Sequence, residues 1–239
     1  MILANRLRMK MPSGCGGDPN CDPYWDNVVL LLHGDGADGS TDIVDSSQSG
    51  HAITVNGSAQ ISTAQSKFGG ASAYFGGTGD YLDAGASTDF NFGTDDFTIE
   101  MFFYRASASG RMDLCGRYLN LSTGFGISTS VYSAGDVLFY FGTNALCISL
   151  GGLWTVGVFN HIAAAKSGQT LRMFINGALA ASATTTLSIS GGNSLKIGAA
   201  GNATQLFLGY IDELRITKGV ARYTADFTPP TAPFPNTGP

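Results

Sequence analysis

The segment from Leu206 to Ile216, LFLGYIDELRI, is the longest unbroken run of strand-forming residues in this chain. Side chains alternate between the two faces of a strand, so every second residue is predicted to share one face: Leu206, Leu208, Tyr210, Asp212, Leu214 and Ile216. Because an unpaired buried charge is costly, either Asp212 has a cationic or hydrogen-bonding partner or this face is not fully closed there. Prolines follow from Pro229 onward. We therefore expect the segment to be the closing strand of an all-β sandwich.

The rest of the chain has the pattern of many short strands joined by turns. Charged residues make up only 13% of the 239 residues, and 33 are glycine, more than a helical protein tolerates. The dipeptide Asn176-Gly177 between two alternating apolar runs indicates a tight hairpin. Strands are predicted at 28–33, 52–55, 58–62, 71–76, 79–83, 96–105, 112–121, 125–131, 136–141, 145–150, 159–166, 170–175, 178–183, 194–198 and 206–217. This pattern is typical of a sandwich or a barrel.

Charge and hydropathy exclude two classes of partner. The net charge of -5 and the pI of about 5.0 argue against nucleic acid, because phosphate binding needs a basic face. No apolar run approaches the length of about 20 residues that a membrane-spanning helix needs. The basic start MILANRLRMKM is followed by Pro12 and a Gly-rich stretch instead of an apolar segment, so we expect no standard export signal.

The cysteines give no disulfide framework. Cys15 and Cys21 flank GGDPN and could close a small loop, while Cys115 and Cys147 lie in separate strand-like runs. Four cysteines in a chain of this length favour four free thiols over two disulfides, and the sequence leaves the choice open.

The order of several segments resembles the laminin-G-like, concanavalin-A-like domains of tailed-phage structural proteins. The segments are VVLLLHGDG, SKFGGASAYFGGTGDYL, FGTDDFTIEMFFYR, FNHIAAAKSGQTLRMFINGALAAS and LFLGYIDELRITKGVARYTADFTPP. The resemblance covers Trp25 to Pro235 and implies a two-sheet antiparallel jelly roll. It divides the chain into an arm at 1–26, a sandwich at 27–235 and a tail at 236–239.

A catalytic set is missing from the sequence. There is no HExxH zinc motif and no GxSxG nucleophile elbow. Glycosidases need two carboxylates across a cleft, but Glu100 is alone on its predicted strand, and no ExDxxE pattern accompanies it or Glu213. We therefore predict a protein that is not an enzyme.

The loop after the first predicted strand is dense in aspartate. Asp35, Asp38, Asp42 and Asp45 supply hard oxygen ligands at short intervals, the type of ligand that calcium takes. The resemblance implies a structural calcium at the rim, for which the predicted ligands are Asp35, Asp45 and Asp212. A solvated acidic loop explains the same residues equally well, so no cofactor is certain.

These observations predict a non-enzymatic structural protein of a phage virion, either a head decoration or a tail or fibre component. Made in the host cytoplasm, it would stand on the virion surface as a homo-oligomer and bind other virion proteins through the arm. The alternative is an adhesin for host surface glycans. Sugars stack on exposed rings, and the aromatic residues that could serve are Tyr81, Tyr104, Tyr118, Tyr132, Phe139, Tyr140, Tyr210 and Tyr223.

Overall fold

The computed structural model describes residues 15–16, 18, 20–118, 124–130, 135–142, 145–149, 151–189 and 193–239, with 145–149 described by backbone alone. The strands are β1 (Val28–Leu32), β2 (Thr54–Asn56), β3 (Gln60–Ser62), β4 (Ser72–Gly76), β5 (Tyr81–Asp83), β6 (Phe97–Tyr104), β7 (Met112–Arg117), β8 (Phe125–Thr129), β9 (Val137–Phe141), β10 (Ala145–Ser149), β11 (Phe159–Ser167), β12 (Thr170–Ile175), β13 (Ala178–Thr184), β14 (Lys196–Ile197) and β15 (Leu208–Lys218). Two 3-10 helices are η1 (Trp25–Asn27) and η2 (Thr88–Phe90). Every strand predicted from the sequence overlaps one of these strands. Neither described helix is long and apolar enough to cross a membrane.

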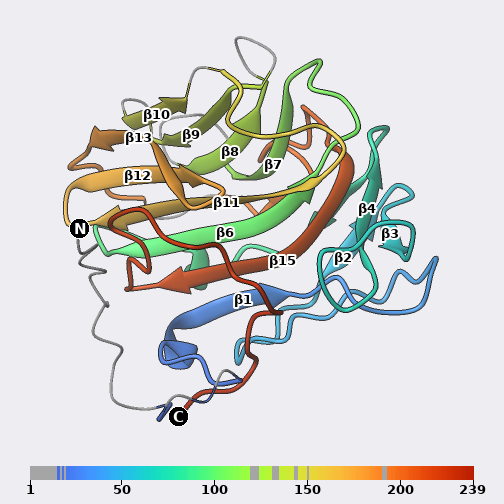
Figure 1. Ribbon diagram of the computed structural model, residues 1–239, viewed down its shortest axis with the longest axis horizontal. Helices are drawn as coiled ribbons and strands as arrows, with labels where there is room; N and C mark the ends of the chain where they lie inside the picture. The colour runs from blue at the N-terminus through green and yellow to red at the C-terminus, as the bar shows by residue number, and fades with distance from the viewer. Residues whose placement is uncertain are drawn as a thin grey trace, which may run out of the picture.

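The strands form two antiparallel sheets stacked on each other (Figure 1). Sheet A has the order β13-β12-β11-β6-β15-β4-β3, and β1 also pairs with β15. Sheet B has the order β10-β9-β8-β7-β14-β5-β2. The predicted all-β, two-sheet jelly-roll sandwich is thereby confirmed.

One apolar core lies between the sheets. Sheet A contributes Phe103 and Ile162, for example, and sheet B contributes Leu82 and Phe139, all fully buried. Trp154, from the loop before β11, packs edge to face on Phe103 with ring centroids 5.5 Å apart. Burial of this apolar surface is the main term that stabilises such a sandwich.

The long C-terminal segment forms β15, the last strand of the described chain, as predicted. It lies inside sheet A, with β6 along one side and both β4 and β1 along the other. Its predicted single face is wrong, because the register with β6 shifts between Asp212 and Arg215, where Glu213 has a φ of 52°. This bulge reverses the alternation.

As a result, the two halves of β15 present different residues to the core. Before the bulge, Ile211 faces the core, while Tyr210 and Asp212 face outward; after it, Leu214 and Ile216 face the core. Asp212 has the hydrogen-bonding partners that its burial required, since Oδ2 accepts from the backbone N–H groups of Lys67 and Phe68 at 2.6 and 3.2 Å.

Segments from the two ends of the chain cover much of the outer face of sheet A. In Figure 1 the red C-terminal tail runs across the front of this sheet. Tyr223 and Phe227 of the tail stack with ring centroids 3.6 Å apart and pack on Ala163, Ala165 and Phe174. Closer to the C-terminus, Phe234 packs with Val28, Leu31 and the ring of Trp25.

The N-terminal segment is hydrogen-bonded to this tail, from the Asp22 N–H to the Thr237 carbonyl, and it contains two of the cysteines. Cys15 and Cys21 form a disulfide, so the prediction of four free thiols is wrong for this pair. The turn between them, in which Asp18 N–H donates to the Cys15 carbonyl, brings the two sulfurs together. Cys115 is free and buried, and the side chain of Cys147 lies outside the described residues. Of the predicted arm, residues 1–14, 17 and 19 also lie outside them.

Candidate functional site

A row of four aromatic side chains crosses the outer face of sheet A; we call it the aromatic ladder. Tyr74 of β4 lies opposite Tyr210 of β15, which lies opposite Tyr104 of β6, which lies opposite Phe159 of β11. Their sequence neighbours Phe75, Phe103 and Ile211 point into the core. Because side chains alternate along a strand, the ladder faces away from the core.

The ladder rings contact one another and are half-buried. Ring centroids are 5.0 Å apart for Tyr74 and Tyr210, 5.6 Å for Tyr210 and Tyr104, and 5.7 Å for Tyr104 and Phe159. The planes are tilted by 43°, 83° and 54° in the same order, so faces and edges alternate along the row. Such tilted and edge-to-face contacts are the favoured arrangements for aromatic pairs and hold the rings in place.

The three tyrosine hydroxyls give the ladder its polar groups. Burial raises the pKa of Tyr210, and the neighbouring Tyr74 and Tyr104 and the carboxylate of Asp38 raise it further. The Tyr210 hydroxyl therefore stays protonated at neutral pH. Among the described residues, none of the three hydroxyls has a hydrogen-bond partner, which leaves them available to a ligand.

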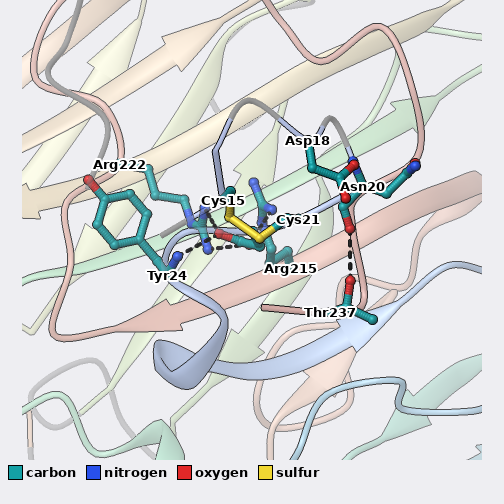
Figure 2. The surroundings of a disulfide bond; sticks show 9 residues. Cys15, Asp18, Asn20, Cys21, Tyr24, Arg215, Arg222 and Thr237 are labelled. Atoms are coloured by element: carbon teal, nitrogen blue, oxygen red, sulfur yellow. Dashed lines mark hydrogen bonds and ion pairs between the residues drawn. A yellow bond between two sulfur atoms is a disulfide. The ribbon is translucent and has the colours of Figure 1, made fainter. Parts of the chain in front are cut away.

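Farther along the same face, a buried ionic network lies beneath the terminal segments. Arg215 donates from Nε and Nη2 to Glu100 Oε1 at 3.0 and 2.8 Å and from Nη1 to Asp22 Oδ2 at 2.9 Å. Arg222 of the tail also donates to Asp22, at 3.0 and 2.7 Å. Figure 2 shows both guanidinium groups converging beside the disulfide.

The contacts that Glu100 makes in this network do not suit a catalytic acid. Its Oε2 accepts the hydroxyl of Tyr223 at 2.8 Å and lies 3.3 Å from His161 Nε2. Burial alone would raise the pKa of Glu100, but Arg215, His161 and Arg222 hold it well below its usual range. A permanently ionised, covered carboxylate cannot donate a proton to a leaving group.

Glu213 and Asp212 lie at the rim of the sandwich, beside His33. Glu213 Oε1 is 2.9 Å from His33 Nδ1, and Oε2 accepts the Phe234 N–H at 2.8 Å. Asp212 Oδ1 is buried without a hydrogen-bond partner. Burial raises the pKa of Asp212 to about 7, against the hydrogen bonds from Lys67 and Phe68 and with help from Glu213 and Asp35.

Two cavities open beside this rim cluster of His33, Asp35, Asp212 and Glu213. One of about 80 Å³ and one of about 490 Å³ are both lined by His33 and Asp35, and the larger is also lined by the 233–235 stretch of the tail. Burial raises the pKa of Asp35, although the charge of His33 opposes the shift.

The three predicted calcium ligands do not come together as one set. Both oxygens of Asp45 are already used: Oδ1 accepts the N–H groups of Leu31 and Ser47, and Oδ2 accepts the N–H of His51. Within the described part of the chain, no three histidine, cysteine, aspartate or glutamate side chains are grouped to hold a metal. The buried Oδ1 of Asp212 has no hydrogen-bond partner among the described residues, and the charge of Asp35 acts on this carboxyl. These two carboxylates suit a cation, and calcium stays a prediction.

The structure sorts the aromatic residues that were considered for sugar binding. Tyr104 and Tyr210 lie in the ladder. Phe139 is in the core, Tyr118 and Tyr140 are buried against each other, and Tyr223 is half-buried and stacked on Phe227. Tyr81 lies on sheet B beside Lys196. Tyr132 lies outside the described residues.

Sequence reasoning missed Tyr74 and Phe159. Tyr74 stands in a predicted strand between Ala73 and Phe75, so alternation could have placed it on the outer face. Phe159 becomes part of the ladder only through its pairing with Tyr104, and no local signal gives that register.

No curated protein sequence matches this chain significantly, whereas solved structures and a family model do. Domain 4 of AbnA, a GH43 extracellular arabinanase from Geobacillus stearothermophilus solved with arabinotriose, is similar in structure, with a TM-score of 0.62 and 17% identity over 82% of this chain and 94% of that one. The binding domain of Paraclostridial Mosquitocidal Protein 1 has a TM-score of 0.63 and 18% identity, over 84% of this chain and 50% of that one. The binding domain of botulinum neurotoxin serotype D has the same TM-score and coverage at 13% identity.

These structural likenesses show the fold alone, and this chain spans only half the length of the two toxin domains. The family is shown by sequence. Residues 75–222, more than half of the chain, match the family model Laminin_G_3, and the chain therefore belongs to the concanavalin A-like lectin/glucanases superfamily.

Proposed function

We propose that this chain is a non-enzymatic, carbohydrate-binding domain that holds its ligand on the aromatic ladder. The observation that carries the proposal is the row Tyr74, Tyr210, Tyr104 and Phe159, half-exposed on the open part of sheet A. A contiguous row of aromatic rings that solvent reaches supports a binding surface.

The chemistry of the ladder suits a sugar. A pyranose or furanose ring has apolar C–H faces that pack on aromatic rings and hydroxyl groups that need partners. The ladder offers both, since it has the rings of four aromatic residues and the hydroxyls of Tyr74, Tyr104 and Tyr210. Two structures with this fold were solved with sugars: the arabinanase domain with arabinotriose, and the binding domain of botulinum neurotoxin DC in complex with SialylT.

Support for a non-enzymatic role comes from the positions of the two glutamates. Glu100 lies under the tail and is bound by Arg215 and Tyr223. Glu213 is bound by His33 and the Phe234 amide. Neither glutamate lies on the ladder, so a sugar bound there would not lie between Glu100 and Glu213 as hydrolysis by a glutamate pair requires.

Binding to a panel of immobilised polysaccharides tests the proposal. Tyr210→Ala and Tyr104→Ala should each weaken binding about tenfold, a loss of about 1.4 kcal/mol. Tyr81→Ala is the matched control, because Tyr81 is a half-exposed tyrosine on the other sheet. The melting temperatures of all variants should stay close to that of the wild type. Equal binding by the ladder variants and the control would overturn the proposal.

The proposal includes a place on the surface of a tailed-phage particle, as a head decoration or a tail or fibre component. The order of segments that resembles phage structural proteins supports it, together with the basic, apolar start of the chain outside the matched family region. We expect that start to bind other virion proteins and the domain to assemble with copies of itself.

Replacing Arg6, Arg8 and Lys10 with serine in the full chain tests this placement. The wild-type chain should be recovered in purified particles by mass spectrometry, and the variant should be depleted about tenfold while its glycan binding is unchanged. Equal recovery of both chains would remove the role of the arm. Absence of the wild-type chain from particles would remove the virion placement and leave the sugar-binding proposal untouched.

A further inference from the structure

The direction of the ladder carries information about its ligand. The four rings belong to four neighbouring strands, β4, β15, β6 and β11, so the row runs across the strands. Strands in a sheet are about 4.8 Å apart. That spacing is close to the length that one sugar unit adds to an extended polysaccharide, so each successive ring can meet a successive sugar.

The row continues past the rings at the β3 edge of the sheet. Gln60 of β3 lies opposite Tyr74 and is half-exposed, on the same outer face, because Ile61 points into the core. Its amide both donates and accepts hydrogen bonds, as the hydroxyls of a sugar require. Leu208, 45% exposed, stands beside the row on β15. The surface therefore offers five positions in a line, and none of the five residues is charged: Gln60, Tyr74, Tyr210, Tyr104 and Phe159.

Charge restricts the class of ligand. A negatively charged side chain, Asp38, lies near the ladder, since its carboxylate contributes to the raised pKa of Tyr210. The ammonium of Lys67 lies over the rings of Phe68 and Phe102 instead, 5.4 and 5.2 Å from their centroids. With a net charge of -5 on the chain as well, an anionic sugar would be repelled from the ladder.

We infer that the ladder binds an uncharged, linear polysaccharide along several consecutive sugars, with the glycan chain lying across the strands from β3 to β11. This inference rests on the proposed function, which requires only that some sugar binds there. It excludes a single terminal sugar and an acidic sugar such as sialic acid as the main ligand.

Calorimetry with oligosaccharides of increasing length provides the test. The probes are α-1,5-linked arabino-oligosaccharides and β-1,4-linked xylo-oligosaccharides from the disaccharide to the hexasaccharide, with sialyllactose as the acidic ligand. For a series that binds, affinity should rise with each added sugar to about the tetrasaccharide or pentasaccharide and then level off. Sialyllactose should not bind.

Variants along the row sharpen the test. Tyr210→Ala, in the middle, should weaken binding of every length about tenfold. Tyr74→Ala and Phe159→Ala, at the ends, should weaken the pentasaccharide about fivefold and the disaccharide less, and Tyr81→Ala should change nothing. Affinity that is independent of length, or tight binding of sialyllactose that Tyr210→Ala abolishes, would overturn this inference alone. No binding of any of these sugars or of the polysaccharide panel would overturn the proposed function and this inference with it.

Discussion

Arg215 and Glu100 form a two-pronged ion pair on the outer face of sheet A, buried under the C-terminal tail, with both Nε and Nη2 of the arginine donating to one carboxylate oxygen. Asp22 from the N-terminal segment and Arg222 and Tyr223 from the tail complete its surroundings. The pair thus joins the sheet to both ends of the chain.

Glu100→Gln should destabilise the protein by about 3 kcal/mol at neutral pH, because removing one member of a buried pair leaves the charge of Arg215 partly uncompensated. The pKa of Glu100 lies below its ordinary value of 4.5, since Arg215, His161 and Arg222 outweigh the effect of burial. The ionised glutamate therefore stabilises the fold above about pH 4.5, and this contribution is lost as the pH falls toward the folded-state pKa.

Urea denaturation between about pH 3 and pH 8 measures the effect. The difference between the wild type and Glu100→Gln should be largest at neutral pH and shrink in acid. Asp42→Asn, at an exposed position, is the control and should stay within about 0.5 kcal/mol of the wild type. A difference that is constant with pH would contradict the assignment.

Asp212 should show the opposite dependence. Its folded-state pKa of about 7 lies above the ordinary value of 3.8, so the fold prefers the protonated acid and loses stability as the pH rises from about 4 to about 7. Asp212→Asn keeps an acceptor for the Lys67 and Phe68 amides and has no charge to bury. In the presence of a chelator, the variant should match or exceed the wild type at pH 8.

A clear loss of stability of Asp212→Asn at pH 8 would contradict the raised pKa. The same pair of proteins tests the calcium prediction. Calcium held by Asp212 would raise the melting temperature of the wild type at pH 8 and leave that of Asp212→Asn unchanged. No shift in either protein would remove Asp212 from the predicted ligands.

Replacing Cys15 and Cys21 by serine should cost about 2 kcal/mol, because the short loop they close no longer restricts the unfolded chain. A reducing agent should lower the urea midpoint of the wild type and leave that of the double variant unchanged. Burial raises the pKa of the Cys115 thiol to about 12, so this group should not react with thiol reagents in the folded protein. Equal responses of both proteins to reductant would exclude a stabilising disulfide.

Gly177→Ala should be more damaging than a glycine substitution in the neighbouring hairpin. Both Gly177 and Gly168 have positive φ, of 84° and 57°, so each substitution has a backbone cost of about 1 kcal/mol. A methyl group at Gly177 would also meet the Phe227 carbonyl of the tail, whereas nothing lies within 4 Å of one at Gly168.

Thermal unfolding of the two variants separates these costs. Gly177→Ala should be less stable than Gly168→Ala by about 1 to 3 kcal/mol, the usual cost of overpacking. Equal melting temperatures would mean that the tail does not rest on the hairpin turn.

Local patterns predicted the strands, because alternation and turn residues are visible in the sequence. They could not predict the bulge at Glu213, where φ is 52°, because it depends on the pairing of β15 with β6 on one side and with β4 and β1 on the other. One inserted residue therefore moved Leu214 and Ile216 to the face opposite Tyr210 and Asp212.

The candidate site was predicted only in part for the same reason. Tyr104 and Tyr210 were among the aromatic residues considered, but nothing local separates them from the buried Tyr118 and Tyr140. The ladder depends on the register of four strands, and the contact between Asp22 and Arg222 joins residues 200 positions apart. Distant pairings of this kind follow from the packing of the whole sandwich.

Two hydrogen bonds join Thr237 to the segment at Asn20 and Asp22, so residues near the two ends of the described chain lie together at one corner of the sandwich (Figure 2). A domain with adjoining ends can be inserted into a loop of another protein, or reconnected by a short linker and reopened elsewhere as a circular permutant, without moving a strand. Because the ladder lies at the opposite end of β15 from the residues that contact this corner, such a graft would still present its rings to solution.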